Sequence, residues 1–157
     1  LLKDFGMKTR HQQGFTLIEL LVTIAVLAII MSMAAPAFAD MRTKQNLNRS
    51  VQELMAVFHD ARSKATLERR DVTVELATQQ QPTISSDTVD TLYWMPYGTS
   101  TLISTPTSLT YNLQGGVKNA ATDTTFTICS NGSGSASKTV SVSMMGTVQM
   151  IGEGVCP

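Results

Sequence analysis

The hydrophobic pattern of the chain begins with a long apolar run. Residues 15–35 are all apolar or small except for Thr16, Glu19, Thr23 and Ser32. At about 1.5 Å of rise per residue, a helix of these 21 residues reaches the roughly 30 Å of a bilayer's hydrocarbon core. The pattern therefore predicts a helix that can span a membrane.

A second helical pattern follows this run directly. Pro36 should kink the helix, because proline lacks the N–H that its turn requires, and we expect the helix to continue beyond it. Apolar residues then recur at three- and four-residue spacing to about Arg69, with charged residues between them. The apolar positions are Leu47, Val51, Leu54, Met55, Phe58, Ala61 and Ala65. This stripe predicts an amphipathic helix over residues 40–70 that packs on a core, in preference to a cofactor site.

After Arg70 the hydrophobic period changes from helical spacing to alternation, which is typical of strands. The alternating apolar positions are Val72, Val74, Leu76, Phe126, Ile128, Val140, Val142, Val148 and Met150. Residues 91–95 and 109–113 are further strand candidates, although prolines lie close to their ends. Residues 131–135, Asn-Gly-Ser-Gly-Ser, predict a hairpin, and the polar residues 77–90 predict a surface loop.

These patterns together predict an α+β fold. A long kinked N-terminal helix has a transmembrane half over residues 15–39 and an amphipathic half over residues 40–70. The amphipathic half packs on a C-terminal antiparallel β-sheet domain over residues 71–157. A chain of 157 residues leaves no room for a second domain of typical size.

The distribution of charge predicts which end of the chain stays in the cytoplasm. The segment before Phe15 carries three basic residues and one acid. Because positive charges precede the span, we expect a cytoplasmic N-terminus and a translocated domain after about Asp40. From Asp71 onward six acids stand against two lysines, so this domain is poorly suited to binding phosphate backbones.

A secretory signal peptide is the main alternative explanation of the apolar run. A basic start, an apolar stretch and Ala37-Phe38-Ala39 before Asp40 all fit a cleaved signal, which would release a soluble domain. The run is longer than the usual 7 to about 15 residues, however, and it contains Glu19. A plain membrane anchor explains the length but also leaves Glu19 unexplained. A carboxylate within a membrane segment is a functional candidate that needs a partner.

The residues around Glu19 resemble a known processing signal. Gly14-Phe15-Thr16-Leu17-Ile18-Glu19, between a short basic leader and about twenty apolar residues, resembles the class III signal of type IV pilins and type II secretion pseudopilins. The resemblance implies that a prepilin peptidase removes a leader, residues 1–14, by cutting between Gly14 and Phe15. It also implies N-methylation of Phe15. Met7 is then a plausible start of the leader.

Cleavage at this point provides a partner for Glu19. The cut creates an α-amine, a cation that the carboxylate four residues away, or one on a neighbouring subunit, can neutralise. In a filament core, loss of one member of such a pair leaves an uncompensated charge that costs about 3 to 5 kcal/mol. Glu19, together with Pro36, is therefore the expected assembly site.

The rest of the chain resembles one branch of this family. Residues 60–65, 69–76 and 140–148 are similar to minor pilins and pseudopilins of the GspH, FimT and FimU type, and to FimU in particular. The resemblance implies a lollipop-shaped filament subunit without a cofactor. Its partners would be other minor pilins, the major pilin, prepilin peptidase and an inner-membrane assembly platform. The precursor would be a single-pass inner-membrane protein with a periplasmic domain, and the mature subunit would enter a pilus at the cell surface.

The two cysteines, Cys129 and Cys156, both lie beyond the apolar run. If the domain is exported, we expect them to form a disulfide, because thiols are oxidised in the periplasm. A loop of 28 residues, counted inclusively, suggests about 3 to 4 kcal/mol of stabilisation in the chain-entropy model. The alternative is a pair of unpaired buried thiols.

The sequence favours neither catalysis nor DNA binding. His11 lies in the leader and His59 stands alone, so we expect no enzyme activity, metal site or cofactor. Some members of the family bind DNA through a basic motif after the glycine of the last long strand, but Gly146 is followed by Thr-Val-Gln. The basic cluster is Arg62, Lys64, Arg69 and Arg70, and nearby acids offset its charge.

These observations predict a structural minor pilin that takes part in assembly, in priming or at the tip of a type IV pilus. The alternatives are a GspH-like pseudopilin of a type II secretion system, which shares fold and processing, and a FimT-like DNA-uptake pilin.

Overall fold

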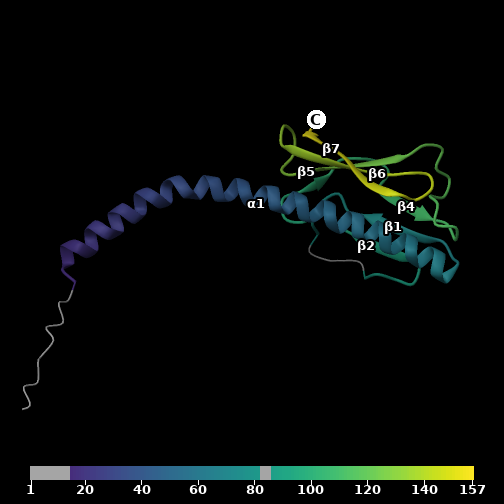
Figure 1. Ribbon diagram of the computed structural model, residues 1–157, viewed down its shortest axis with the longest axis horizontal. Coiled ribbons are helices and arrows are strands. Elements are labelled where there is room, and N and C mark those ends of the chain that lie inside the picture. Colours follow the sequence, from purple (N-terminus) through teal and green to yellow (C-terminus); the bar gives the residue numbers. More distant parts are fainter. Residues whose placement is uncertain (1–14, 82–85) are drawn as a thin grey trace, which may run out of the picture. The chain divides into compact units, whose positions relative to one another are not determined.

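The computed structural model describes residues 15–81 and 86–157 (Figure 1). One long helix, α1 (Leu17–Glu68), is followed by seven strands. The strands are β1 (Val72–Leu76), β2 (Thr91–Trp94), β3 (Thr101–Leu102), β4 (Ser108–Tyr111), β5 (Thr124–Cys129), β6 (Ala136–Val142) and β7 (Val148–Val155). The chain divides into two compact units after Phe38, so the first part of α1 belongs to one unit and its remainder to the other.

The first turn of α1 is capped by a side chain. The Oγ1 of Thr16 accepts a hydrogen bond from the backbone N–H of Glu19 at 3.3 Å. This satisfies one of the N–H groups that the first turn of a helix leaves without an intrahelical partner. The hydrophobic period does not indicate this cap, although Thr-x-x-Glu is its sequence signature.

The helix continues through Pro36, as predicted, and ends at Glu68. The next residue, Arg69, has a φ of 52°, and the N–H of Arg70 donates to the carbonyl of Ala65 at 3.2 Å. This is a Schellman cap, in which a left-handed residue turns the chain back toward the last helical carbonyls. It directs the chain into β1 after a connection of three residues, 69–71.

The strands form two sheets. The first has the order β2-β1-β4 and the second has the order β3-β5-β6-β7. In the second sheet every neighbouring pair is antiparallel, and the predicted hairpin at 131–135 joins β5 to β6. The N–H of Asn131 donates to the Oγ of Ser135 at 3.1 Å across this turn.

One pair of strands differs from the predicted antiparallel pattern. β1 and β2 run parallel, with Thr73 opposite Thr91 and Leu76 opposite Trp94. Alternation predicts that a segment is a strand but does not predict the direction of its neighbour. β3 did not emerge from alternation either, since it is only two residues long. The predicted fold class, a long N-terminal helix followed by a β-sheet domain, is confirmed.

The predicted apolar stripe of α1 forms one side of the domain core. Leu47, Val51, Leu54, Phe58, Ala61 and Ala65 are each at most 3% exposed. Phe58 packs against Phe126 of β5, with the ring centroids 5.1 Å apart. Met55, which the pattern placed in the same stripe, is only partly buried at its edge. Burial of this stripe fixes the second half of α1 on the sheets.

A buried serine fastens a loop to this half of α1. The Oγ of Ser50 donates to the carbonyl of Asn46 at 2.8 Å and accepts from the N–H of Tyr97 at 2.7 Å. Ser50 is completely buried, so both of its bonds are shielded from water. This hydroxyl therefore joins the loop after β2 to α1, together with Arg49, whose guanidinium lies 4.0 Å from the centroid of the Tyr97 ring.

Candidate functional site

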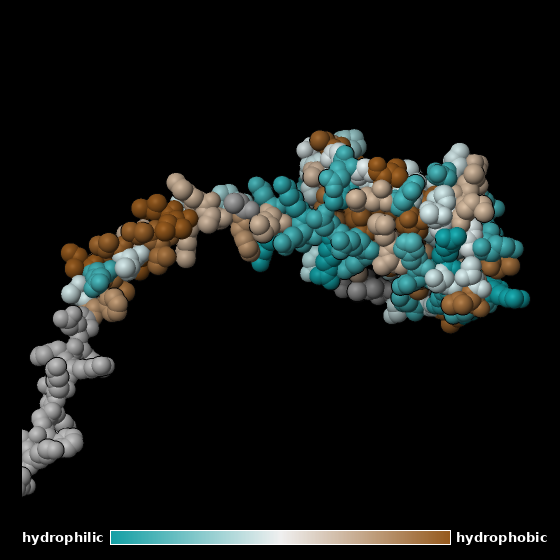
Figure 2. Space-filling view, viewed as in Figure 1, coloured by the Kyte–Doolittle hydropathy of each residue, from teal (hydrophilic) through white to brown (hydrophobic). Residues whose placement is uncertain are grey.

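The first part of α1 presents apolar side chains to its surroundings on every side. Each residue from Phe15 to Pro36 is exposed. Apolar side chains, brown in Figure 2, gather along this segment. By length and composition alone, the segment is long and apolar enough to cross a membrane. A signal sequence also meets this criterion. An exposed apolar helix of this length needs lipid or other helices around it.

Two hydroxyl groups of this segment donate to carbonyls within the helix. The Oγ1 of Thr23 donates to the carbonyl of Leu20 at 2.8 Å, and the Oγ of Ser32 donates to the carbonyl of Ile29 at 2.7 Å. These side chains therefore carry little cost in an apolar environment, because their donors are already paired.

Glu19 is different from these residues. It is the single charged residue between Phe15 and Ala39. Its backbone N–H is bonded to Thr16, but within residues 15–81 and 86–157 no ion pair involves its carboxylate. Its position in the first turn is favourable for a negative charge, because the helix dipole is positive there. In a membrane or a bundle of helices, this carboxylate is the group of the segment that still requires a partner.

The predicted processing site lies at the edge of the described structure. Phe15 is exposed and precedes the first helical residue by two positions. Gly14 lies outside the described residues, as does the rest of the predicted leader. Cleavage between Gly14 and Phe15 and methylation of Phe15 therefore stay predictions.

Pro36 lies within α1 and is exposed, two residues before the boundary between the units. Proline removes one backbone hydrogen bond from a helix, so this is a position of weakened helical pairing. A role of Pro36 in assembly stays a prediction.

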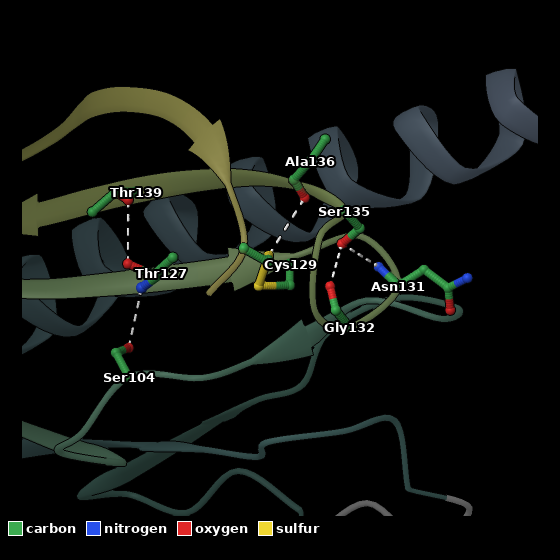
Figure 3. Close-up of a disulfide and its surroundings, with 9 residues drawn as sticks. Ser104, Thr127, Cys129, Asn131, Gly132, Ser135, Ala136 and Thr139 are labelled. Carbon is green, nitrogen blue, oxygen red and sulfur yellow. Dashed lines mark hydrogen bonds between the residues drawn. A yellow bond between two sulfur atoms is a disulfide. The ribbon is translucent and has the colours of Figure 1, made fainter.

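A disulfide joins the end of β5 to the segment after β7. Cys129 and Cys156 are bonded, with their Cα atoms 5.9 Å apart (Figure 3). The N–H of Cys156 donates to the carbonyl of Ser135 at 2.8 Å, and the N–H of Gly134 donates to the carbonyl of Cys156 at 3.0 Å. The last residues of the chain are thus held to the β5–β6 hairpin by one covalent bond and two hydrogen bonds.

The basic cluster near the end of α1 is largely engaged within the domain. The Nη2 of Arg62 donates to the carbonyl of Met145 at 3.0 Å, and the Nζ of Lys64 donates to the carbonyl of Thr88 at 3.1 Å. Arg70 forms ion pairs with Glu68 and with Asp90, the latter at 2.9 Å. The hydrogen bond that Arg70 donates to Glu68 raises the pKa of the Arg70 guanidinium. These contacts engage basic side chains that would otherwise be available to bind DNA phosphates.

No catalytic constellation is visible in the described part of the chain. A cavity of about 520 Å³ lies between α1 and strands β1 and β2, and Glu53, Glu75 and Trp94 are among its lining residues. His59 is exposed on α1 and does not line this cavity. Within the described residues, no three His, Cys, Asp or Glu side chains lie together in a group that could hold a metal ion.

Two family profiles match the chain. Residues 9–35 match the prokaryotic N-terminal methylation motif, which covers Gly14, Phe15 and Glu19. Residues 50–146 match the family described as type II transport protein GspH. The second match begins within α1 and extends into the connection between β6 and β7.

Similar proteins include bacterial fimbrial proteins. The chain is 33% identical over 94 residues to a fimbrial protein of Pseudomonas aeruginosa, which is 60% of this chain and 54% of that protein. It therefore spans about half the length of this relative. It is also 47% identical over 45 residues to fimbrial protein Q of Moraxella bovis, which is 29% of each chain.

The fold is similar to that of a solved pilin. Two crystal structures of the type IV minor pilin FimU of Pseudomonas aeruginosa superpose on the chain with TM-scores of 0.51 and 0.50. They share 23% and 24% sequence identity with it and cover 69% and 68% of this chain, and 90% and 93% of FimU. At this identity the likeness concerns the fold.

The GspH profile covers more than half of the chain, and the methylation motif precedes it, as expected for an N-terminal helix followed by a pilin-like domain. The chain therefore belongs to the GspH family, whose members are structural pilins and pseudopilins.

Proposed function

We propose that this protein is a structural minor pilin of a type IV pilus. It takes part in assembly, either in a priming complex or at the tip of the filament, together with other minor pilins and the major pilin. The methylation motif, the likeness to FimU and the fimbrial relatives support this function.

The observation that carries the proposal is the state of Glu19. An exposed apolar helix contains one charged side chain, and this side chain is the group that the helix leaves without a partner. An α-amine released four residues earlier, on the same or on a neighbouring subunit, supplies that partner. The charge pair then favours one register between packed subunits, because any other register leaves a charge uncompensated.

Processing and location follow from the same segment. The precursor is inserted as a single-pass inner-membrane protein with its N-terminus in the cytoplasm and its domain in the periplasm. Prepilin peptidase cuts it between Gly14 and Phe15 and methylates Phe15, and an assembly platform in the inner membrane moves it into the filament. Because the helix leaves lipid and not water, close packing against other helices and neutralisation of Glu19 favour this transfer.

A pseudopilin of a type II secretion system is the second candidate. The description of the matching family, a type II transport protein, favours it. Both candidates share cleavage, methylation and helix packing, so they differ in the machine that the subunit joins. Affinity purification of the full chain from cells distinguishes them: recovery with the major pilin supports the first, and recovery with secretion-channel components supports the second.

Replacement of Glu19 tests the proposal. In Glu19→Ala the cut chain retains an α-amine without a carboxylate, so we expect the protein to remain in the membrane and its amount in sheared filaments to fall more than tenfold. Thr23→Val is the matched control, because it also removes a polar group from the segment but leaves no charge unpaired. Immunoblots of filament and membrane fractions measure both variants. Normal abundance of Glu19→Ala in filaments would contradict the proposed charge pairing.

A further inference from the structure

β7 is the longest unpaired strand edge among the strands that the structure describes. The two sheets have β2, β4, β3 and β7 at their edges, and β7 has eight residues whereas the others have at most four. From Gln149 to Val155 every residue of β7 is exposed. A long edge strand presents unpaired N–H and C=O groups to which another strand can bond.

The outer backbone groups of β7 can be assigned from neighbouring hydrogen bonds. The N–H and C=O of Cys156 both bond to the hairpin between β5 and β6. Because backbone direction alternates along a strand, the N–H and C=O of Val155 and Glu153 point away from β6. The carbonyl of Ala136, opposite Val155, bonds to Ser130 on the β5 side, which agrees with this assignment.

The side chains along this edge do little to block it. Gly152 and Gly154 carry no side chain, and a Cβ added at Gly152 would meet nothing within 4 Å. Glu153 is the single charged residue of β7, and its charge is offset by Lys138 of β6 at 2.6 Å. Native edge strands usually carry charges, prolines or bulges that prevent pairing. β7 contains no proline, its one charge is paired with Lys138, and its bulge precedes Gly152.

Two further features shape the edge. A bulge places Ile151 between the paired residues Met150 and Gly152, so regular pairing outward is confined to the part from Gly152 to Val155. The disulfide at Cys156 holds the far end of this part in place. This part of β7 is therefore already ordered before a partner strand binds, so binding loses less conformational entropy.

We propose that β7 is a docking edge for an extended, uncharged segment of an adjacent subunit in the filament. The segment adds to the second sheet next to β7, bonds to the outward groups of Glu153 and Val155, and packs apolar side chains against Ile151 and Val155. This inference rests on the proposed function, because the partner is another pilin.

The extent of the edge favours a filament neighbour over a free dimer of this chain. A stable complex in solution buries at least about 1,000 Å², which a pairing of four residues does not approach. Subunits held together through their helices have a high effective concentration, at which a short strand addition is sufficient. The low charge of the edge likewise suits a neutral segment, because a charged one would lose solvation without gaining an ion pair.

Photo-crosslinking of the full chain in filaments tests this proposal. Benzoylphenylalanine is placed at Val155 or, as a control, at Val89, a valine in the loop before β2 that is 57% exposed against 73% for Val155. We expect ultraviolet light to link position 155 to another pilin through a peptide of that subunit, and to give no such product at position 89. Val155→Lys adds a charged, flexible side chain to the edge and should lower filament abundance at least about threefold relative to Val89→Lys.

Each alternative result has a distinct meaning. A chain that is present in filaments but gives no adduct at position 155, or gives only an adduct with a second copy of itself, overturns the docking edge and leaves the pilin function intact. Equal filament abundance of Val155→Lys and Val89→Lys overturns it as well. Absence of the unmodified chain from filaments overturns the proposed function and the docking edge together. Fluorescence of Trp94 checks that both lysine variants are folded.

Discussion

Replacement of Gly146 by alanine should be among the most damaging single changes in the domain. Gly146 lies in the connection between β6 and β7 and has a φ of 79°, which is left-handed. A Cβ at this position would overlap the carbonyl oxygen of Gly115 and would lie 3.1 Å from a ring carbon of Tyr111. The backbone of residue 115 and a fully buried ring both oppose the new atom, so neither can move aside easily.

The expected cost has two parts. A left-handed backbone costs a non-glycine residue about 1 to 2 kcal/mol. Forcing an extra group into a packed site costs about 1 to 3 kcal/mol more. Gly146→Ala should therefore lower the free energy of unfolding by about 2 to 5 kcal/mol.

Gly132→Ala is a control that separates the two parts. Gly132 has nearly the same φ, 81°, but a Cβ at this position would meet nothing within 4 Å. Its replacement should cost only the backbone term, about 1 to 2 kcal/mol. The difference between the variants then measures the clash with Gly115 and Tyr111, without the backbone term.

Denaturant unfolding of the full chain in detergent micelles measures both variants. Trp94 is the only tryptophan and is buried, so its fluorescence reports unfolding of the domain. Parallel slopes of free energy against denaturant would justify a direct comparison of the midpoints. If Gly146→Ala were no less stable than Gly132→Ala, the close approach of residues 115 and 146 would be wrong.

Four further predictions use the same unfolding assay. The double variant Cys129→Ser, Cys156→Ser should lower the free energy of unfolding by about 3 to 4 kcal/mol, because a closed loop no longer restricts the unfolded chain, and an unchanged midpoint would contradict this. Ser50→Ala should cost about 0.5 to 1.5 kcal/mol, since it removes the acceptor of the part-buried N–H of Tyr97, and a neutral effect would show that other contacts hold this loop. Tyr111→Phe should be neutral or stabilising, because the buried Tyr111 hydroxyl has no hydrogen-bond partner among the described residues, and a loss above about 1 kcal/mol would contradict that. Burial raises the pKa of Tyr111, so the wild type should lose stability as the pH rises above the ordinary tyrosine value of about 10, and Tyr111→Phe should lose less.

The helix was the part of the fold that hydrophobic pattern predicted best. The spacing of Leu47, Val51, Leu54 and Phe58 repeats over several turns, and each of these side chains is buried. Few structures other than an amphipathic helix would bury every apolar residue of a repeat this long. The end of the helix at Glu68 was equally close to the predicted limit, although its cap uses arginine where glycine is usual.

The arrangement of the short strands was harder to predict. Alternation locates β1 and β2, but their pairing depends on contacts with other elements. The length of the connection between Leu76 and Thr91 indicates a parallel pair. Its fourteen residues exceed a hairpin loop and are enough for a parallel crossover. β3 forms only one short register with β5 and has no pattern of its own.

The functional residues also differ in how well the sequence predicts them. Composition alone identifies Glu19, because a charge in an apolar segment is conspicuous, and the structure adds that neighbouring hydroxyl groups are already satisfied. The β7 edge could not be found from sequence. Residues 148–155 alternate poorly, and their exposure depends on which strand lies last in the sheet.

Mass spectrometry of the mature N-terminus tests the central claim most directly. The full-length protein is purified from membranes and filaments of cells that contain a prepilin peptidase, and its N-terminal peptide is sequenced. The proposed function predicts a chain that starts at Phe15 with one methyl group on its α-amine. A chain that starts at Asp40 would show that the apolar helix is a cleaved secretion signal, and would contradict the account.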